Sequence, residues 1–133
     1  MNRDIFKART NILPYEYPQL LAYKDAIRHS YWIDTEFNFT EDIQDFKVTI
    51  NANEKDVIKK TMLSIAQIEV NVKTFWADMY KRMPITEVGD VGMTFAESEV
   101  RHKDAYARLL RILGLEKEFQ SVIEVPAIAG RLK

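Results

Sequence analysis

Glu99 and His102 form a Glu-x-x-His element whose two side chains could bind a metal ion together. Three residues apart on a helix, a carboxylate and an imidazole lie side by side on the same face. Tyr106 follows on that face, roughly 6 Å beyond His102 along the helix axis. These polar residues interrupt an apolar stripe with steps of four and three, whose other members are Phe95, Leu109 and Leu113. Three polar groups at core positions are hard to explain by packing and predict a functional site.

A further carboxylate, Glu69, interrupts the apolar stripe of the preceding helical segment. The other members of that stripe recur at steps of four and three and are Ile58, Met62, Ile65, Val72, Trp76 and Met79. A buried charge without a partner is costly, so Glu69 needs compensation, either from Lys73 one turn later or from a bound cation. Glu69 lies 15 residues before Pro84 and Glu99 lies 15 residues after it, which predicts antiparallel helices with both carboxylates at similar depth.

Glu69, Glu99 and His102 together are half of the ligand set of a carboxylate-bridged dimetal site in a helix bundle. Such a site takes one Glu from each of two helices and Glu-x-x-His from each of two others. Carboxylate oxygen and neutral imidazole suit iron or manganese, and a chain without cysteine argues against structural zinc. The structural alternatives are an ion pair between Glu69 and Lys73 and, for Tyr106, an ordinary core tyrosine with its hydroxyl bonded.

Long helices must position these residues, and the composition favours them. Gly and Pro total 8 of 133 residues, and none occurs between Gln19 and Met83. We therefore predict an all-α fold, with a capping box at Asn51 and Glu54 and with Gly114 just after a helix end. The helices are expected at about Pro18–His29, Glu41–Phe46, Asn53–Arg82, from Thr86 or Asp90 to Leu113, and Leu115–Ile123.

Length and charge exclude several other classes of protein. The 133 residues suit one domain, and a net charge of −1 gives no field to attract nucleic acid. No segment is long and apolar enough to act as a membrane span or secretion signal, so a soluble protein of the cytoplasm is expected.

Trp32 with the following Ile-Asp-Thr-Glu-Phe-Asn-Phe-Thr, then Glu69, then Glu99-x-x-His102-x-x-x-Tyr106, resembles a known family over essentially the whole chain. The chain is similar to the radical-generating small (β) subunit of class I ribonucleotide reductase. The resemblance implies a ferritin-like helix bundle, usually a homodimer, that holds a dinuclear metal centre. The oxidised centre starts a radical transfer to the large (α) subunit, where ribonucleotides are reduced to deoxyribonucleotides.

By the same resemblance, Glu69, Glu99 and His102 are metal ligands, Tyr106 has the position of the radical tyrosine, and Trp32 lies on the transfer route. Common diiron members have Asp where this chain has Glu69, and Lys73 also departs from the tyrosyl-radical type. Both departures resemble a dimanganese subclass activated by superoxide, in which the metals store the oxidising equivalent and Tyr106 need not carry a radical. A lysine ammonium beside the site would attract an anionic oxidant. Manganese is therefore favoured, with iron as the alternative.

The chains of this family are more than twice as long and carry the other half of the ligands in the part that this sequence lacks. Residues 1–133 are thus expected to be one partial domain, the N-terminal part of the bundle, completed by a C-terminal part; the chain is either a fragment of a longer chain or one piece of a split chain. One alternative is a ferritin-like metal-oxidising or storage protein whose site forms between two copies of the chain. Another is a helical interaction module in which Glu69, Lys73, Glu99 and His102 form a buried polar network without metal.

Overall fold

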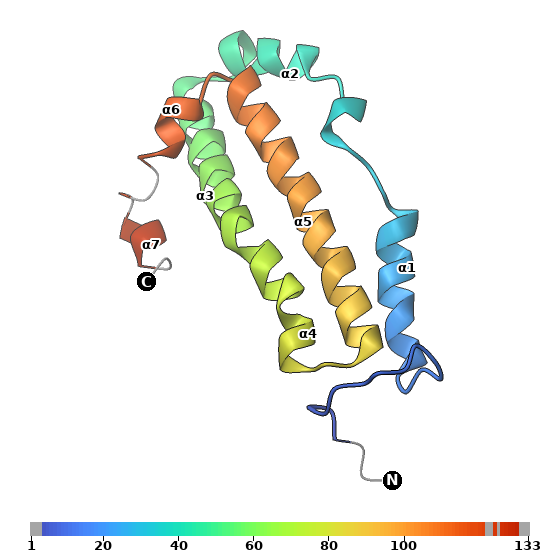
Figure 1. Ribbon diagram of the computed structural model, residues 1–133. Helices are drawn as coiled ribbons and strands as arrows, with labels where there is room; N and C mark the ends of the chain where they lie inside the picture. The colour runs from blue at the N-terminus through green and yellow to red at the C-terminus, as the bar shows by residue number, and fades with distance from the viewer. Residues whose placement is uncertain (1–3, 122–123, 125, 131–133) are drawn as a thin grey trace. The chain divides into compact units, whose positions relative to one another are not determined.

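The computed structural model describes residues 4–121, 124 and 126–130, and every regular element among them is helical (Figure 1). The all-α prediction is thereby confirmed, and no helix in this part of the chain is long and apolar enough to cross a membrane. Among the elements with described bounds, η1 and η2 are 3-10 helices and η3 is a π-helix. The elements are η1 Pro18–Leu20, α1 Leu21–His29, η2 Asp34–Glu36, α2 Thr40–Gln44, η3 Asp45–Thr49, α3 Ala52–Ala77, α4 Met79–Arg82, α5 Thr86–Ile112, α6 Glu116–Phe119 and α7 Pro126–Ala129.

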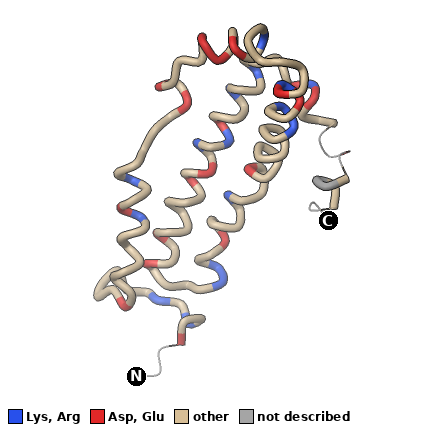
Figure 2. The backbone as a smooth tube through the Cα atoms, turned by 180° about the vertical axis from the view of Figure 1, so that it is seen from behind, with Lys and Arg blue, Asp and Glu red and all other residues tan. Residues whose placement is uncertain are grey.

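The chain divides into two compact units, and both long helices contribute to each. The first unit comprises Met1–Trp32 and Asn71–Val100, and the second comprises Ile33–Val70 and Arg101–Lys133. Acidic and basic residues are interspersed along α3 and α5 (Figure 2), as the near-zero net charge suggests.

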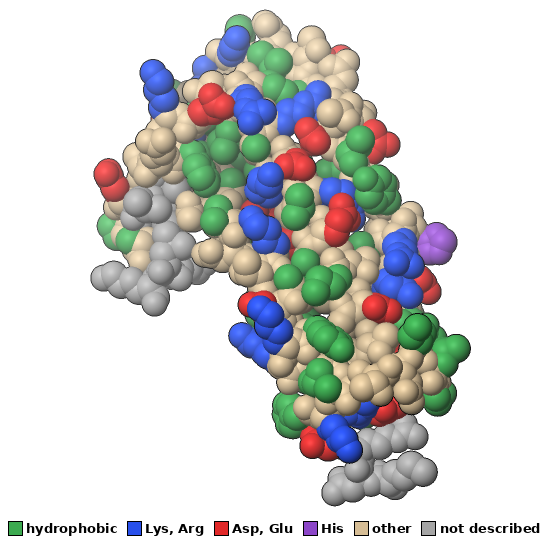
Figure 3. Space-filling model, viewed as in Figure 1, with side chains coloured by type: hydrophobic (Ala, Val, Ile, Leu, Met, Phe, Trp, Pro, Cys, Tyr) green, Lys and Arg blue, Asp and Glu red, His purple; other side chains and the backbone are tan. Residues whose placement is uncertain are grey.

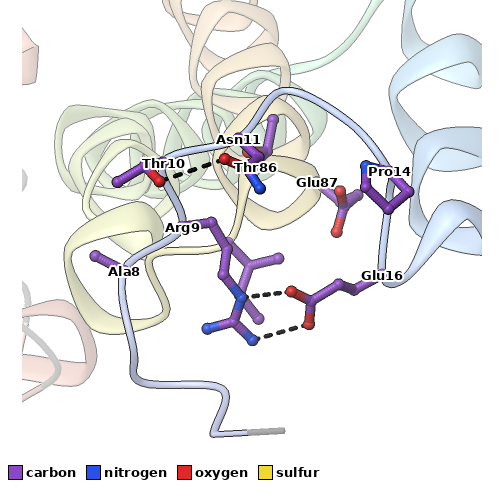
Figure 4. A pocket seen from close by; sticks show the side chains of 9 residues that line it. Ala8, Arg9, Thr10, Asn11, Pro14, Glu16, Thr86 and Glu87 are labelled. Atoms are coloured by element: carbon purple, nitrogen blue, oxygen red, sulfur yellow. Dashed lines mark hydrogen bonds and ion pairs between the residues drawn. The ribbon is translucent and has the colours of Figure 1, made fainter.

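In the first unit, the N-terminal arm is fastened to the beginning of α5. Arg9 donates two hydrogen bonds to the carboxylate of Glu16, from Nε at 2.6 Å and Nη2 at 2.9 Å (Figure 4). The Arg9 backbone N–H donates to the Pro84 carbonyl at 3.1 Å. Glu87, only 2% exposed, accepts a hydrogen bond from the Tyr17 backbone N–H at 3.3 Å. A carboxylate in the first turn of a helix is favoured by the helix dipole. These contacts hold the segment that leads into α1.

Two glycines of α5 allow the helices of the first unit to approach closely. A Cβ atom at Gly92 would lie 2.5 Å from the backbone carbonyl oxygen of Trp76, and one at Gly89 would lie 2.7 Å from Cδ2 of Tyr80. Both distances are shorter than van der Waals contact, so a larger residue at Gly92 would push the two backbones apart, whereas one at Gly89 would displace the Tyr80 side chain. Gly92 thus sets the spacing at which the end of α3 packs on α5.

The predicted helix from Asn53 to Arg82 is wrong in one respect, because it is interrupted at Asp78. The Asp78 N–H still donates to the Thr74 carbonyl at 3.0 Å, but the next bond, from the Lys81 N–H to the Asp78 carbonyl, spans three residues. Asp78 has φ −82° and ψ −4°, outside the regular α-helical values. The chain therefore forms α3 and a separate short α4 before Pro84.

In the second unit, α3 and α5 share a small core and α5 ends as predicted. Gly114 adopts φ +70°, its N–H donates to the Arg111 carbonyl at 3.1 Å, and the Leu115 N–H donates to the Leu110 carbonyl at 2.8 Å. This pair of bonds is a Schellman motif, which brings the apolar residues on either side of the glycine together. The core consists of Leu63, Ala66, Leu110 and Leu115, with Phe46, Met62, Tyr106, Leu113 and Phe119 packed around it.

Other local predictions have mixed outcomes. Asn51 and Glu54 form the expected capping box, with reciprocal bonds of 2.8 Å and 3.0 Å between side chain and backbone. The fifth predicted helix is shorter than expected, because α6 ends at Phe119 and Gln120 and Ser121 form a turn, whereas Val122 and Ile123 lie outside the described residues. Ile58 and Ile65, predicted as core, are 44% and 39% exposed, because their side of α3 is left open.

Candidate metal centre

Glu69 of α3 and Glu99 and His102 of α5 come together as a group able to hold a metal ion. Each offers one ligand atom, and these three atoms all lie within 4.8 Å of one another. All three residues are partly buried. The periodicity that predicted the proximity of Glu69 and Glu99 thus has a counterpart in the structure, and two carboxylates with one imidazole are donors that suit manganese or iron.

Glu99 is held by a tryptophan from the neighbouring helix. The indole Nε1–H of Trp76 donates to Oε1 of Glu99 at 3.2 Å. Trp76 also packs edge-to-face on Phe95, with ring centroids 4.7 Å apart at 70°. The Glu99 carboxylate therefore has a defined orientation set by α3.

Glu69 and Tyr106 influence each other electrostatically. Burial raises the pKa of the Tyr106 hydroxyl above its usual value, and the negative charge of Glu69 raises this pKa further. One carboxylate oxygen of Glu69, Oε2, is itself buried. Tyr106 also borders a cavity of about 270 Å³, whose other walls include Ala66, Val70 and Phe119. Tyr106 is thus a neutral phenol at the edge of the core, beside a carboxylate.

Lys73 and Trp32 are the two remaining residues singled out from the sequence. Lys73 is partly buried on α3, one turn after Glu69. Trp32 is also partly buried and lies in the irregular segment between α1 and η2. The structure therefore brings Glu69, Glu99 and His102 close together, and it places Tyr106 near enough to Glu69 for the charge of Glu69 to act on it.

Three polar contributions along these helices are not predicted by the sequence pattern. Trp76 was predicted only as a core residue, but its indole N–H donates a hydrogen bond to Glu99. Ser98 and Arg101 are 7% and 6% exposed, so α5 buries polar residues on either side of Glu99 as well. Trp76 could have been suspected, since a buried indole needs an acceptor, but its partner depends on how the helices pack.

Comparison with known proteins decides which family carries this pattern. Residues 9–133 match the family described as ribonucleotide reductase, small chain. The chain belongs to this family. Its all-helical fold is accordingly the ferritin-like fold of the reductase small chain, at partial length.

Two viral relatives show how much of a reductase small chain is present. Over 115 residues the sequence is 29% identical to a probable ribonucleoside-diphosphate reductase small subunit of Invertebrate iridescent virus 6, covering 84% of this chain and 31% of that protein. Over 124 residues it is 25% identical to the corresponding probable small subunit of Invertebrate iridescent virus 3, covering 92% and 33%. This reductase small chain thus spans about a third of each relative's length.

Proposed function

We propose that this reductase small chain is the N-terminal part of a radical-generating subunit that serves ribonucleotide reduction by a large (α) subunit in the cytoplasm. The observation that carries the proposal is the group of Glu69, Glu99 and His102, whose ligand atoms lie within 4.8 Å of one another in a chain of this family. The partners and the reaction of the complete protein belong to the proposal.

The three residues would hold part of a dinuclear metal centre. Two carboxylates supply hard, anionic oxygen ligands and can bridge two ions, and His102 supplies a neutral nitrogen. When bound, the metal pair supplies a one-electron oxidant. The burial of these side chains supports this role, because a cation would compensate two carboxylates that are partly removed from water.

We favour manganese over iron because of two residues of α3. Glu69 occupies the position where common diiron members have Asp, and Lys73 follows one turn later. The Lys73 ammonium would draw an anionic oxidant such as superoxide toward Glu69 and could donate hydrogen bonds to it. Iron remains the alternative metal.

Tyr106 and Trp32 would serve the movement of electrons. The Tyr106 phenol is protonated at neutral pH, as any tyrosine would be, and its raised pKa extends this state to higher pH. In the manganese form we expect Tyr106 to hold its proton and to act as a structural neighbour of Glu69. Trp32 would accept an electron from the direction of the large subunit and pass it inward.

A further segment is required to complete the ligand set, and one face of α3 supports this requirement. We define the open stripe as Val57, Ile65, Ile68 and Phe75, all of them exposed and all on one side of α3. Figure 3 shows exposed hydrophobic side chains among the charged ones on the face turned to the viewer. An apolar helix face in a globular protein is normally covered. We propose that the C-terminal part of a longer small chain covers it, within a homodimer of such chains.

The experiment is an activity assay with the whole polypeptide that carries these residues. The polypeptide is loaded with Mn(II) or Fe(II), treated with superoxide or dioxygen, mixed with its large subunit, and assayed for deoxyribonucleotide. We expect product from the wild type and from His29→Ala, which changes an exposed histidine, and none from His102→Ala. Absence of product under every combination of metal and oxidant would contradict the proposal.

Paramagnetic resonance of the activated protein shows where the oxidising equivalent is stored. If the metals alone store it, no tyrosyl radical is expected. A tyrosyl signal that disappears in Tyr106→Phe would overturn this metal-only version, while leaving the family role intact.

A second candidate is a metal-oxidising or storage protein in which two copies of the chain build one site. The open stripe also favours it, because a second copy could cover the apolar surface and supply another Glu, Glu and His. It predicts two metal ions per two 133-residue chains without any other protein. Metal oxidation would then survive Trp32→Phe and Lys73→Gln.

A further inference from the structure

The contact between Trp76 and Glu99 joins the two long helices beside the candidate metal centre. The indole nitrogen is a donor only, so it bonds the Glu99 carboxylate as an acceptor. The 3.2 Å bond to Oε1 restrains the rotation of the carboxylate about its last side-chain bond. Rotation of this group determines which oxygen lone pairs are available to a cation.

Two phenylalanines hold the indole ring in place. Phe95, one turn before Glu99 on α5, packs on Trp76 at 4.7 Å between centroids, and Phe75 packs on it at 5.2 Å with an interplanar angle of 75°. Edge-to-face pairs of this kind add stabilisation beyond the area that they bury. The ring therefore cannot turn its N–H away from Glu99 without losing aromatic contacts.

The backbone also supports the contact. Gly92 lies opposite Trp76, where a Cβ atom would be 2.5 Å from the Trp76 carbonyl oxygen and 3.3 Å from Cβ of Met79. Only glycine lets α5 pass this close to α3. Gly92, Phe95 and Glu99 thus form one face of α5 that receives Trp76.

We propose that Trp76 is a positioning residue for Glu99. By donating to Oε1, it sets the orientation in which Glu99 offers its carboxylate to a metal ion. The inference rests on the metal centre proposed above and adds to it a residue that binds no metal itself. Outer contacts that orient a ligand typically change metal affinity about 10- to 100-fold.

The first test needs no metal. The indole N–H resonances of the whole polypeptide are recorded by heteronuclear NMR, and Trp76→Phe identifies the Trp76 signal by its disappearance. We expect Glu99→Gln to shift this signal and Glu97→Gln, an exposed carboxylate two residues earlier, to leave it in place. A Trp76 signal that ignores Glu99→Gln would overturn the inference.

The second test measures Mn(II) affinity from the loss of the free-ion paramagnetic signal. We expect Trp76→Phe, which removes the N–H and keeps a packed ring, to weaken binding about 10- to 100-fold. Phe75→Leu, which removes one of the two ring contacts of Trp76 and keeps the N–H, should give an affinity between those of Trp76→Phe and the wild type. Equal affinity of Trp76→Phe and the wild type would overturn the positioning role alone. A wild-type polypeptide that takes up no Mn(II) would overturn the metal centre and the positioning role together.

Discussion

The two long helices differ in how completely the chain covers them. In its first turns α5 buries Glu87, Val88, Gly89, Val91 and Gly92, whereas α3 buries only Leu63 and Ala66 among its 26 residues. Figures 1 and 2 both show α1 running beside the first half of α5 in the first unit. The other face of α3 carries the open stripe. A helix with an apolar stripe on a second face is adapted to a second partner, so α3 is the helix along which the bundle would be extended.

The largest expected effect comes from a pair of substitutions on opposite sides of α3. Leu63→Ala removes a side chain that is 4% exposed in the core and should lower the free energy of unfolding by about 2–5 kcal/mol. Ile68→Ala, at a 51% exposed position of the open stripe, should change it by less than about 0.5 kcal/mol in the 133-residue chain.

Urea unfolding of both variants measures this difference. Repeating the measurement in a longer polypeptide sharpens the comparison. If a further segment covers the open stripe there, Ile68→Ala should lower the free energy of unfolding of that polypeptide. Equal costs for the two substitutions in the 133-residue chain would contradict the distinction between a covered and an open face.

A smaller effect is expected where α5 meets α3 and α4. Gly92→Ala places a methyl group against the Trp76 backbone and should cost about 1–3 kcal/mol. Gly89→Ala meets only the ring of Tyr80, which is exposed enough to rotate away, and should cost less. Thermal unfolding ranks the two variants, and a reversed order would show that α5 is not packed as closely on Trp76 as described.

The start of α3 should depend on its cap, since tertiary packing supports that end weakly. Asn51→Ala removes the side-chain acceptor of the Glu54 N–H and should lower the free energy of unfolding by about 1 kcal/mol. Asn53→Ala, in the first turn but outside the capping box, is the matched control and should be close to neutral. Denaturant midpoints of the two variants check this, and equal midpoints would argue against the cap.

The smallest effect concerns pH and Tyr106. Since burial and the charge of Glu69 raise the pKa of Tyr106 on folding, the unfolded chain loses this proton first as the pH rises. Tyr106 should therefore lower the free energy of unfolding only above about pH 10, the ordinary pKa of tyrosine, and should have no such effect at lower pH. The free energy of unfolding of the wild type and of Tyr106→Phe, measured over this pH range, tests the prediction. Parallel pH profiles for the two proteins would contradict it.

Helical periodicity was sufficient to identify the candidate ligands from the sequence. Steps of three and four place Glu99 beside His102 whatever the rest of the fold does, and the short turn at Pro84 aligns Glu69 with them. The caps at Asn51 and Gly114 were also predictable, because they depend on a few consecutive residues.

Features that depend on packing between helices were not predictable in this way. The interruption of the helix at Asp78 has no clear local signal in the sequence, because neither Gly nor Pro occurs there. The bond from Trp76 to Glu99 depends on the close approach allowed by Gly92. The exposure of Ile58 and Ile65 depends on which segments cover α3, and periodicity marks apolar faces without telling what covers them.

The central claim, that Glu69, Glu99 and His102 hold metal, is tested most directly by the metal content of the whole polypeptide. Elemental analysis after loading with Mn(II) or Fe(II) compares the wild type with Glu99→Gln and with the control Glu97→Gln, which changes a neighbouring exposed carboxylate on the same helix. We predict bound metal in the wild type and in Glu97→Gln, and its loss in Glu99→Gln. Equal metal content in Glu99→Gln and the wild type would contradict the claim.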